Sequence, residues 1–264
     1  MNASRSNHLR GASAGRRNIL LAGAAGIALP ALGVAGCATS PSPAASSVRF
    51  EPPRVSLGDR WVYQEINRYS RLPVSRTSVT VTAIEPVLVC SVQREPTETQ
   101  AGAIARPDAP IEERYAGPWE VIHEPTYDLP LDFAEPVPLL PQALRPGETI
   151  SERTSYTVPG YSGRYRWDQR LKAVGVERVT TAAGTFDCLH VQRRIFFAYP
   201  DVFRFGSSRL DDLWYASEVN RWVVREWTGD YLHENSLDRM GTRRREDWVR
   251  WELVAYEPRV AARG

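Results

Sequence analysis

The sequence has little net charge, and this lack excludes one large class of partner. It contains 33 Lys and Arg residues and 31 Asp and Glu residues, so its formal net charge is +2. Four Arg residues and no acidic residue fall within residues 1–36, which leaves 29 cationic and 31 acidic side chains, a net charge of −2, in the rest of the chain. Non-specific binding of nucleic acid requires a concentrated basic surface. We therefore expect no nucleic-acid partner.

The sequence also lacks the motifs of common enzyme active sites. It has no Gly-x-Ser-x-Gly nucleophile elbow, no Gly-rich phosphate loop and no dinucleotide fingerprint. His123 and His233 are each followed by Glu, but neither has the second His of a metal-binding H-E-x-x-H motif. Cys188 and His190 share one strand face, yet structural zinc needs four ligands and no second pair is evident. We expect no metal, no cofactor and no enzymatic activity.

Only one long hydrophobic run is present, and it lies near the N-terminus. Ile19–Val34 is about 16 residues long and is interrupted by Pro30. A membrane-spanning helix needs roughly 20 apolar residues, whereas this length suits the apolar region of an export signal. We therefore predict that residues 1–36 form a signal peptide. Arg16–Leu20 resembles a twin-arginine export motif, with Gly15 where that motif usually has Ser or Thr, so both the twin-arginine and the general export route remain open.

Val34–Cys37 (VAGC) resembles the bacterial lipobox. The resemblance implies cleavage before Cys37 and attachment of fatty-acyl chains such as palmitate to that residue. Several acyl chains, at about 0.8 kcal/mol per buried CH₂, anchor a protein stably where one chain would not. The residue directly after Cys37 is Ala38 and not Asp, and in Gram-negative lipoproteins this favours the outer membrane, facing the periplasm, over the inner membrane. We expect a lipoprotein of the cell envelope, with residues 37–47 as the lipidated Cys and a flexible tether.

Residues 48–258 form a single predicted β-domain, followed by a disordered tail at 259–264. Apolar and polar residues alternate with a period of two, as in Thr77–Ala83, where β-branched residues alternate with hydroxyl groups. No sustained period of 3.6 residues follows residue 48, which argues against helices. The stretches predicted as strands are 77–83, 87–92, 148–158, 164–176, 186–199, 213–216, 221–228 and 247–256.

Six prolines fall within Pro125–Pro146 and interrupt this pattern. Proline cannot donate a hydrogen bond to a neighbouring strand. We therefore predict a long crossover loop here instead of a central strand. A functional lid and an extended segment packed across one end of the sheet are both open interpretations.

Three segments together resemble a known family. They are Gly58–Tyr63 (GDRWVY), Thr180–Cys188 with its AGTF turn, and Leu213–Val224, in which Asn220 stands where a Gly is usual. Their order is similar to that of the TapB-like family of uncharacterised bacterial envelope proteins. The resemblance implies an all-β fold, a curved and mostly antiparallel sheet akin to the open half-barrel of the LolA/LolB lipoprotein carriers. It implies no catalytic residues. We therefore expect an open or half β-barrel with a Pro-rich crossover loop.

Cys90 and Cys188 lie in apolar stretches and have two open interpretations. Outside the cytoplasm they could form a disulfide, which over a loop of this length would contribute roughly 4–5 kcal/mol in the chain-entropy model. Alternatively, both are buried free thiols, because Cys often acts as a small hydrophobic residue. Sequence spacing does not decide between the two interpretations.

The leading functional hypothesis is a non-enzymatic, membrane-anchored lipoprotein whose β-domain binds an apolar or amphipathic ligand or a partner protein. Trp214, Trp222, Trp227 and Trp251 are the candidate ligand face, with packing in the core as the alternative. A second hypothesis is an envelope hydrolase of glycan or ester bonds, for which Asp211-Asp212 could supply paired acids, although a solvated loop is the simpler interpretation of this pair. A third hypothesis is a structural accessory subunit of an envelope complex.

Overall fold

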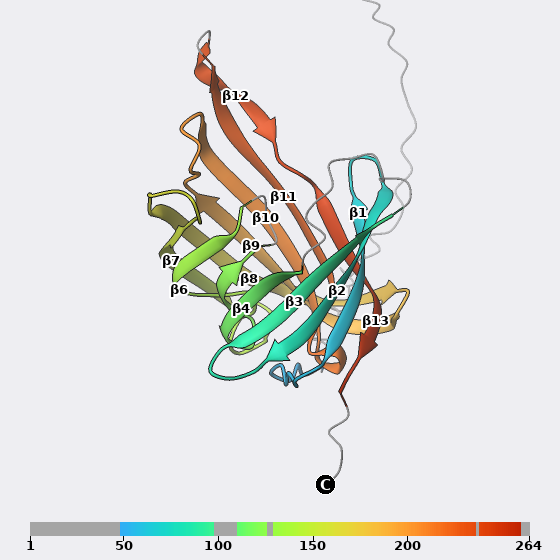
Figure 1. Ribbon diagram of the computed structural model, residues 1–264. Helices are drawn as coiled ribbons and strands as arrows, with labels where there is room; N and C mark the ends of the chain where they lie inside the picture. The colour runs from blue at the N-terminus through green and yellow to red at the C-terminus, as the bar shows by residue number, and fades with distance from the viewer. Residues whose placement is uncertain (1–47, 98–109, 126–128, 236–237, 260–264) are drawn as a thin grey trace, which may run out of the picture. The chain divides into compact units, whose positions relative to one another are not determined.

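The structure is a computed structural model, and residues 48–97, 110–125, 129–235 and 238–259 are described (Figure 1). Residues 45–264 form a compact unit of their own. The predicted signal peptide (1–36) and the predicted lipidated Cys37 with its tether (37–47) lie outside the described residues. Arg259, the first residue of the predicted tail, donates its backbone N–H to Asp59 Oδ1 at 2.8 Å. No helix among the described residues is long and apolar enough to cross a membrane.

The described residues form an all-β fold, which confirms the predicted fold class. One 3₁₀ turn, η2 (Ser217–Val219), joins two of the strands. The thirteen strands are β1 (Arg60–Asn67), β2 (Leu72–Ala83), β3 (Leu88–Pro96), β4 (Ile111–Gly117), β5 (Glu120–Glu124), β6 (Leu131–Pro138), β7 (Thr149–Thr157), β8 (Tyr165–Thr181), β9 (Gly184–Phe197), β10 (Arg204–Ala216), β11 (Arg221–Asn235), β12 (Asp238–Arg245) and β13 (Val249–Glu257).

The sheet closes into an antiparallel barrel. Strands β1 to β10 pair in sequence order, β1 also pairs with β13, and β13 pairs with β11. The pairing of β11 with β10 joins the two ends of the sheet, so twelve strands form a closed barrel. The thirteenth strand, β12, is attached to β11 alone (Figure 1). The expected half-barrel is therefore corrected to a closed barrel, in which the pairing of β10 with β11 covers the edges that an open sheet would expose there.

Each stretch predicted as a strand overlaps a strand of the structure. These stretches correspond to β2, β3, β7, β8, β9, β10, β11 and β13. Five further strands, β1, β4, β5, β6 and β12, were not among those stretches. The basic run Arg243–Arg245, which suggests a solvated turn, forms the end of β12.

The Pro-rich segment is not a crossover loop throughout, because residues 131–138 form strand β6 of the barrel wall. This strand pairs with β5 from Leu131 to Pro138. Its ladder with β7 consists of two pairs, Asp132 with Thr157 and Phe133 with Tyr156. Pro136 and Pro138 have no N–H to donate to either neighbour. We use the term seam for the gap in the wall between residues 134–138 of β6 and residues 149–155 of β7.

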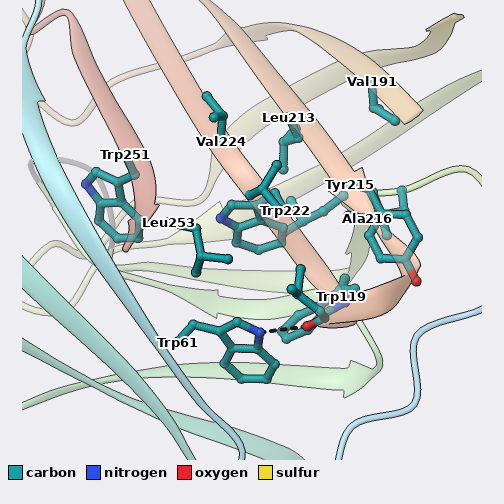
Figure 2. Packing of buried hydrophobic residues seen from close by; sticks show 14 of the residues in the cluster. Trp61, Trp119, Val191, Leu213, Tyr215, Ala216, Trp222, Val224, Trp251 and Leu253 are labelled. Carbon is teal, nitrogen blue, oxygen red and sulfur yellow. Dashed lines mark hydrogen bonds between the residues drawn. The ribbon is translucent and has the colours of Figure 1, made fainter. Parts of the chain in front are cut away.

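Large aromatic side chains fill much of the barrel interior. Trp61, Trp119 and Trp222 pack together, with ring centroids 5.8 Å apart for Trp61 and Trp119 and 5.3 Å apart for Trp119 and Trp222 (Figure 2). Trp61 Nε1 donates to the carbonyl of Val219 at 2.7 Å, the bond that is dashed in Figure 2. A second, smaller cluster lies around Trp167 between β6 and β9. Aromatic residues contribute both large buried area and specific edge-to-face contacts, so these clusters stabilise the closed wall.

Candidate functional site

The structure does not bring the four candidate tryptophans together on one face. Trp222 and Trp251 are fully buried in the interior, and Trp227 is nearly so. Trp214 lies half-buried on the outer face of β10, where its ring stacks on His190 at a centroid distance of 4.5 Å. Because side chains alternate between the two faces of a strand, Trp214 points away from the buried Leu213 and Tyr215. Three of the four residues are therefore core residues.

A buried arginine stands among three of the interior tryptophans. The guanidinium of Arg221 lies 4.1 Å from the ring centroid of Trp222 and 4.6 Å from that of Trp119. Its Nη2 also forms an ion pair with Glu113 Oε2 at 2.8 Å. Burial raises the pKa of the Glu113 carboxyl, but the charge and hydrogen bond of Arg221 outweigh this effect, so the pKa lies below its usual value. The pair is thus held charged inside the wall.

A second buried ion-pair network occupies the middle of the barrel. Asp211 is fully buried in β10, with Oδ2 at 2.6 Å from Arg193 Nη1 and 3.0 Å from Arg225 Nη2. Arg225 also pairs with Glu124 at 2.9 Å, and Arg193 donates to the amide oxygen of Gln169. The interpretation of Asp211-Asp212 as a solvated loop is therefore wrong. Both oxygens of Asp211 are engaged by arginines.

The three histidines among the described residues lie on different parts of the barrel. His123 of β5 contacts Asp132 of β6 at 2.6 Å. His233 of β11 stacks against Phe203, in the loop that follows β9. His190 of β9 lies on the outer face, away from both. Within the described residues, no three His, Cys, Asp or Glu side chains gather with the geometry of a metal site.

His190 is the centre of a polar cluster on the outer face. Its Nδ1 is 2.8 Å from Glu177 Oε1 and its Nε2 is 2.8 Å from Asp212 Oδ1. Burial lowers the pKa of the imidazole, but the hydrogen bonds and charges of Asp212 and Glu177 raise it above its usual value. Trp214 Nε1 donates to Glu177 Oε2 at 2.8 Å, so the cluster ties the end of the β8–β9 hairpin to β10.

Cys90 and Cys188 are both free, buried thiols in the structure. Burial raises the pKa of each thiol to about 12. Because the thiolate is the reactive form, neither Cys has the character of a nucleophile. They contribute to the apolar core instead.

The seam opens onto a hollow of about 480 Å³. Its apolar lining comes mainly from prolines and from Leu140, Leu144 and Ile150, and no Lys or Arg lines it. Glu120, Glu148 and Glu152 lie on its rim. None of these three glutamates has an ion-pair partner among the residues that the structure describes. The lining prolines are Pro52, Pro53, Pro118, Pro136, Pro138 and Pro141.

Sequence reasoning did not identify the seam or the buried charges. The cluster of prolines at residues 125–146 was the only available sign of the seam, and it suggested a loop. Nothing in the sequence indicates that some arginines are buried, because the alternation of apolar and polar residues assigns charged side chains to the outer face of a strand.

Comparison with known proteins gives a family resemblance and a fold resemblance. Residues 119–228 match DUF3108, a protein family of unknown function. No curated protein matches the chain. Two solved structures are similar. One is a "putative lipoprotein" from Parabacteroides distasonis ATCC 8503, with 15% identity, 79% of this chain and 99% of that chain covered, and a TM-score of 0.44.

The other is a "putative exported protein with YmcC-like fold" from Bacteroides fragilis NCTC 9343, with 11% identity, 80% of this chain and 100% of that chain covered, and a TM-score of 0.37. The match to DUF3108 runs from the residue before β5 into β11. It therefore includes both sides of the seam and the buried network around Asp211.

Proposed function

We propose that the chain is a membrane-anchored lipoprotein of the bacterial cell envelope whose barrel is not an enzyme and binds a partner protein at the seam. The anchor rests on the lipobox at Val34–Cys37. The binding role rests on one observation, the contrast between an interior filled with side chains and a wall that is left unpaired at the seam.

The packing of the barrel interior favours a scaffold protein over a carrier that encloses a small ligand. A carrier requires an open apolar cavity, as in typical small-molecule sites. Here the interior holds five tryptophans and three arginines that are less than 2% exposed. These residues are Trp61, Trp119, Trp167, Trp222, Trp251, Arg193, Arg221 and Arg225.

The seam suits an extended polypeptide segment. Residues 149–155 of β7 pair with β8 on one side, and on the other side the ladder to β6 starts only at Tyr156. An unpaired strand edge binds extended segments by adding them to the sheet. Glu120 and Glu152 are exposed beside this edge. Their charge favours a segment that carries Lys or Arg.

The arrangement of side chains gives no support to the hydrolase alternative. His123, His190 and His233 lie on separate elements. Among the described residues, the His123 ring hydrogen-bonds to Asp132 and the His190 ring to Glu177 and Asp212, which are all carboxylates. Asp211 is sequestered by two arginines. A general acid with a paired nucleophile or base is therefore not assembled around these residues.

Labelling with palmitate tests the anchor. We expect the wild-type chain to incorporate the label and Cys37→Ser to lose it, because the thiol carries the acyl chain. Cys188→Ser is the matched control, since it removes a buried thiol that takes no acyl group, and it should label as the wild type does. Label retained in Cys37→Ser would contradict a lipobox at this position.

Site-specific photocrosslinking in cells tests the binding role. A benzophenone side chain in place of Gln142, which is exposed, faces the hollow at the seam, and the same group in place of Arg76 lies on the exposed outer face of β2. We expect a protein adduct from position 142 and none from position 76. The adduct should decrease when Glu120→Lys is added, because the rim then repels a basic segment. An adduct with lipid or glycan alone would contradict the proposal.

A further inference from the structure

The outer face of β8 and β9 carries two arginines that form no ion pair with any described residue, although Glu152 and Asp168 line the hollow beside them. Arg170 and Arg194 are direct cross-strand partners and both are exposed. Like charges placed directly opposite each other destabilise a sheet. Neither guanidinium has an ion-pair partner among the described residues.

Two other exposed arginines of the strands have carboxylate partners. Arg114 pairs with Glu112 at 2.9 Å and Arg153 pairs with Asp168 at 2.8 Å. Arg76 of β2 is also exposed and forms no ion pair within the described part of the chain. Its cross-strand neighbours, however, are Gln64 and Glu95, whereas Arg170 and Arg194 face each other.

Two hollows adjoin these arginines. The first, of about 420 Å³, crosses the outer face of β9, β10 and β11 and ends at Arg245 and Trp248. The second, of about 370 Å³, lies over β7, β8 and β9 and includes Arg170. Arg194 and Phe196 line both hollows, so the two are neighbours on one surface.

Exposed apolar side chains accompany the arginines. Phe196 is 58% exposed, and the loop that joins β9 to β10 presents Val202 (81%) and Phe203 (56%). Phe205, 39% exposed, pairs with Leu232 on the same outer face, and Leu232 pairs in turn with Arg243 of β12. We name the surface formed by Arg170, Arg194, Phe196, Phe205 and Arg245 the arginine face. Arginine beside exposed aromatic groups is typical of surfaces that lie at a membrane interface.

We infer that the arginine face binds the surface of a bilayer that contains anionic phospholipid. The guanidinium groups of Arg170, Arg194 and Arg245 bind the lipid phosphates, since the planar fork of arginine fits phosphate oxygens. The aromatic side chains enter the boundary between headgroups and acyl chains. This inference goes beyond the proposed function, because it requires neither the lipid anchor nor the seam.

The tether is long enough for the face and an anchor at Cys37 to reach one membrane. Glu51 is bound at the β10–β11 turn, where its N–H donates to Ser217 Oγ at 2.8 Å and its carbonyl accepts from Tyr215 at 2.7 Å. From that turn to Leu210, in the first hollow, is roughly 23 Å along β10 at about 3.3 Å per residue. The segment from Cys37 to Val48 can span at most about 36–40 Å.

Vesicle flotation tests the inference with residues 38–264, which contain the whole closed barrel and lack the signal and the acylated Cys. We expect binding to vesicles of phosphatidylcholine mixed with phosphatidylglycerol and none to phosphatidylcholine alone. The double variant Arg170→Gln/Arg194→Gln should bind about thirty-fold more weakly, because each arginine contributes a similar share near an anionic surface. Arg145→Gln is the matched control. It removes an exposed, unpaired arginine from the turn between β6 and β7 and should leave binding unchanged.

Three results would overturn the inference. They are no binding to the mixed vesicles, equal binding by the double variant, and binding of inorganic pyrophosphate without vesicle binding, which would indicate a site for a soluble anion. Thermal melting checks that both variants are folded. The photocrosslink from position 142, which lines the seam hollow and neither hollow of the arginine face, should persist in the double variant, so a failure of this inference is distinguishable from a failure of the seam.

Discussion

At the scale of single residues, the barrel depends on charges placed where a sequence pattern predicts apolar side chains. Arg193, Asp211 and Arg225 lie in strands that alternation predicts correctly, yet all three point inward. No rule based on one sequence could have found them, because each arginine is stabilised by a partner on another strand. Burying charged side chains costs free energy, because they lose their contacts with water. Ion pairing offsets this cost only when further hydrogen bonds reach the remaining polar atoms of the pair.

Asp211→Asn should reduce the free energy of unfolding by about 3–5 kcal/mol, because it leaves two buried arginines without their shared carboxylate. Urea denaturation at neutral pH measures the loss. Asp187→Asn is the control, since Asp187 forms an exposed pair with Arg178 and should cost at most about 1 kcal/mol. Equal losses in the two variants would show that the Asp211 network contributes nothing beyond a surface pair.

His190 should make stability depend on pH in the range above about 6.5. The pKa of His190 is raised in the folded protein, so its contribution is fully present below the unfolded pKa of about 6.5 and is lost as the pH rises through the folded value. We expect the free energy of unfolding of the wild type to fall over this range relative to that of His190→Gln. Parallel pH profiles for the two proteins would refute this role of the Glu177–His190–Asp212 cluster.

At the scale of elements, clean alternation was sufficient for some strands and failed for others. β2 and β13 have regular apolar positions and were predicted. β4 was missed because Glu113, one of its inward residues, is charged, and β6 was missed because it contains two prolines. Both failures have one physical cause. Tertiary partners override the local pattern in each strand: Arg221 of β11 pairs with the inward Glu113 of β4, and β5 pairs with β6.

Hydrogen exchange should reveal the seam as a weak part of the wall. Backbone amides of residues 149–155 that face β6 should exchange faster than those of residues 165–172 in β8, because β8 is paired on both sides. Mass spectrometry of exchanged peptides measures the difference. Equal protection of the two segments would mean that the seam is closed in solution.

At the scale of the whole molecule, the all-β fold could be predicted and the closure could not. Period-two alternation indicates strands wherever they lie, whereas closure depends on pairings such as β1 with β13, which are far apart in the sequence. The same limit applies to the candidate site. The tryptophans were recognised as important, but only the closed wall decides that Trp222, Trp227 and Trp251 face inward and Trp214 outward.

Native mass spectrometry of purified residues 38–264 tests most directly the claim that the interior is structural and that binding occurs on the wall. The account predicts the mass of the polypeptide alone, or a lipid adduct that disappears in Arg170→Gln/Arg194→Gln. A lipid or glycan bound at one per chain and retained in that double variant would contradict it, because such a molecule would have to occupy the space that the tryptophans and ion pairs are held to fill.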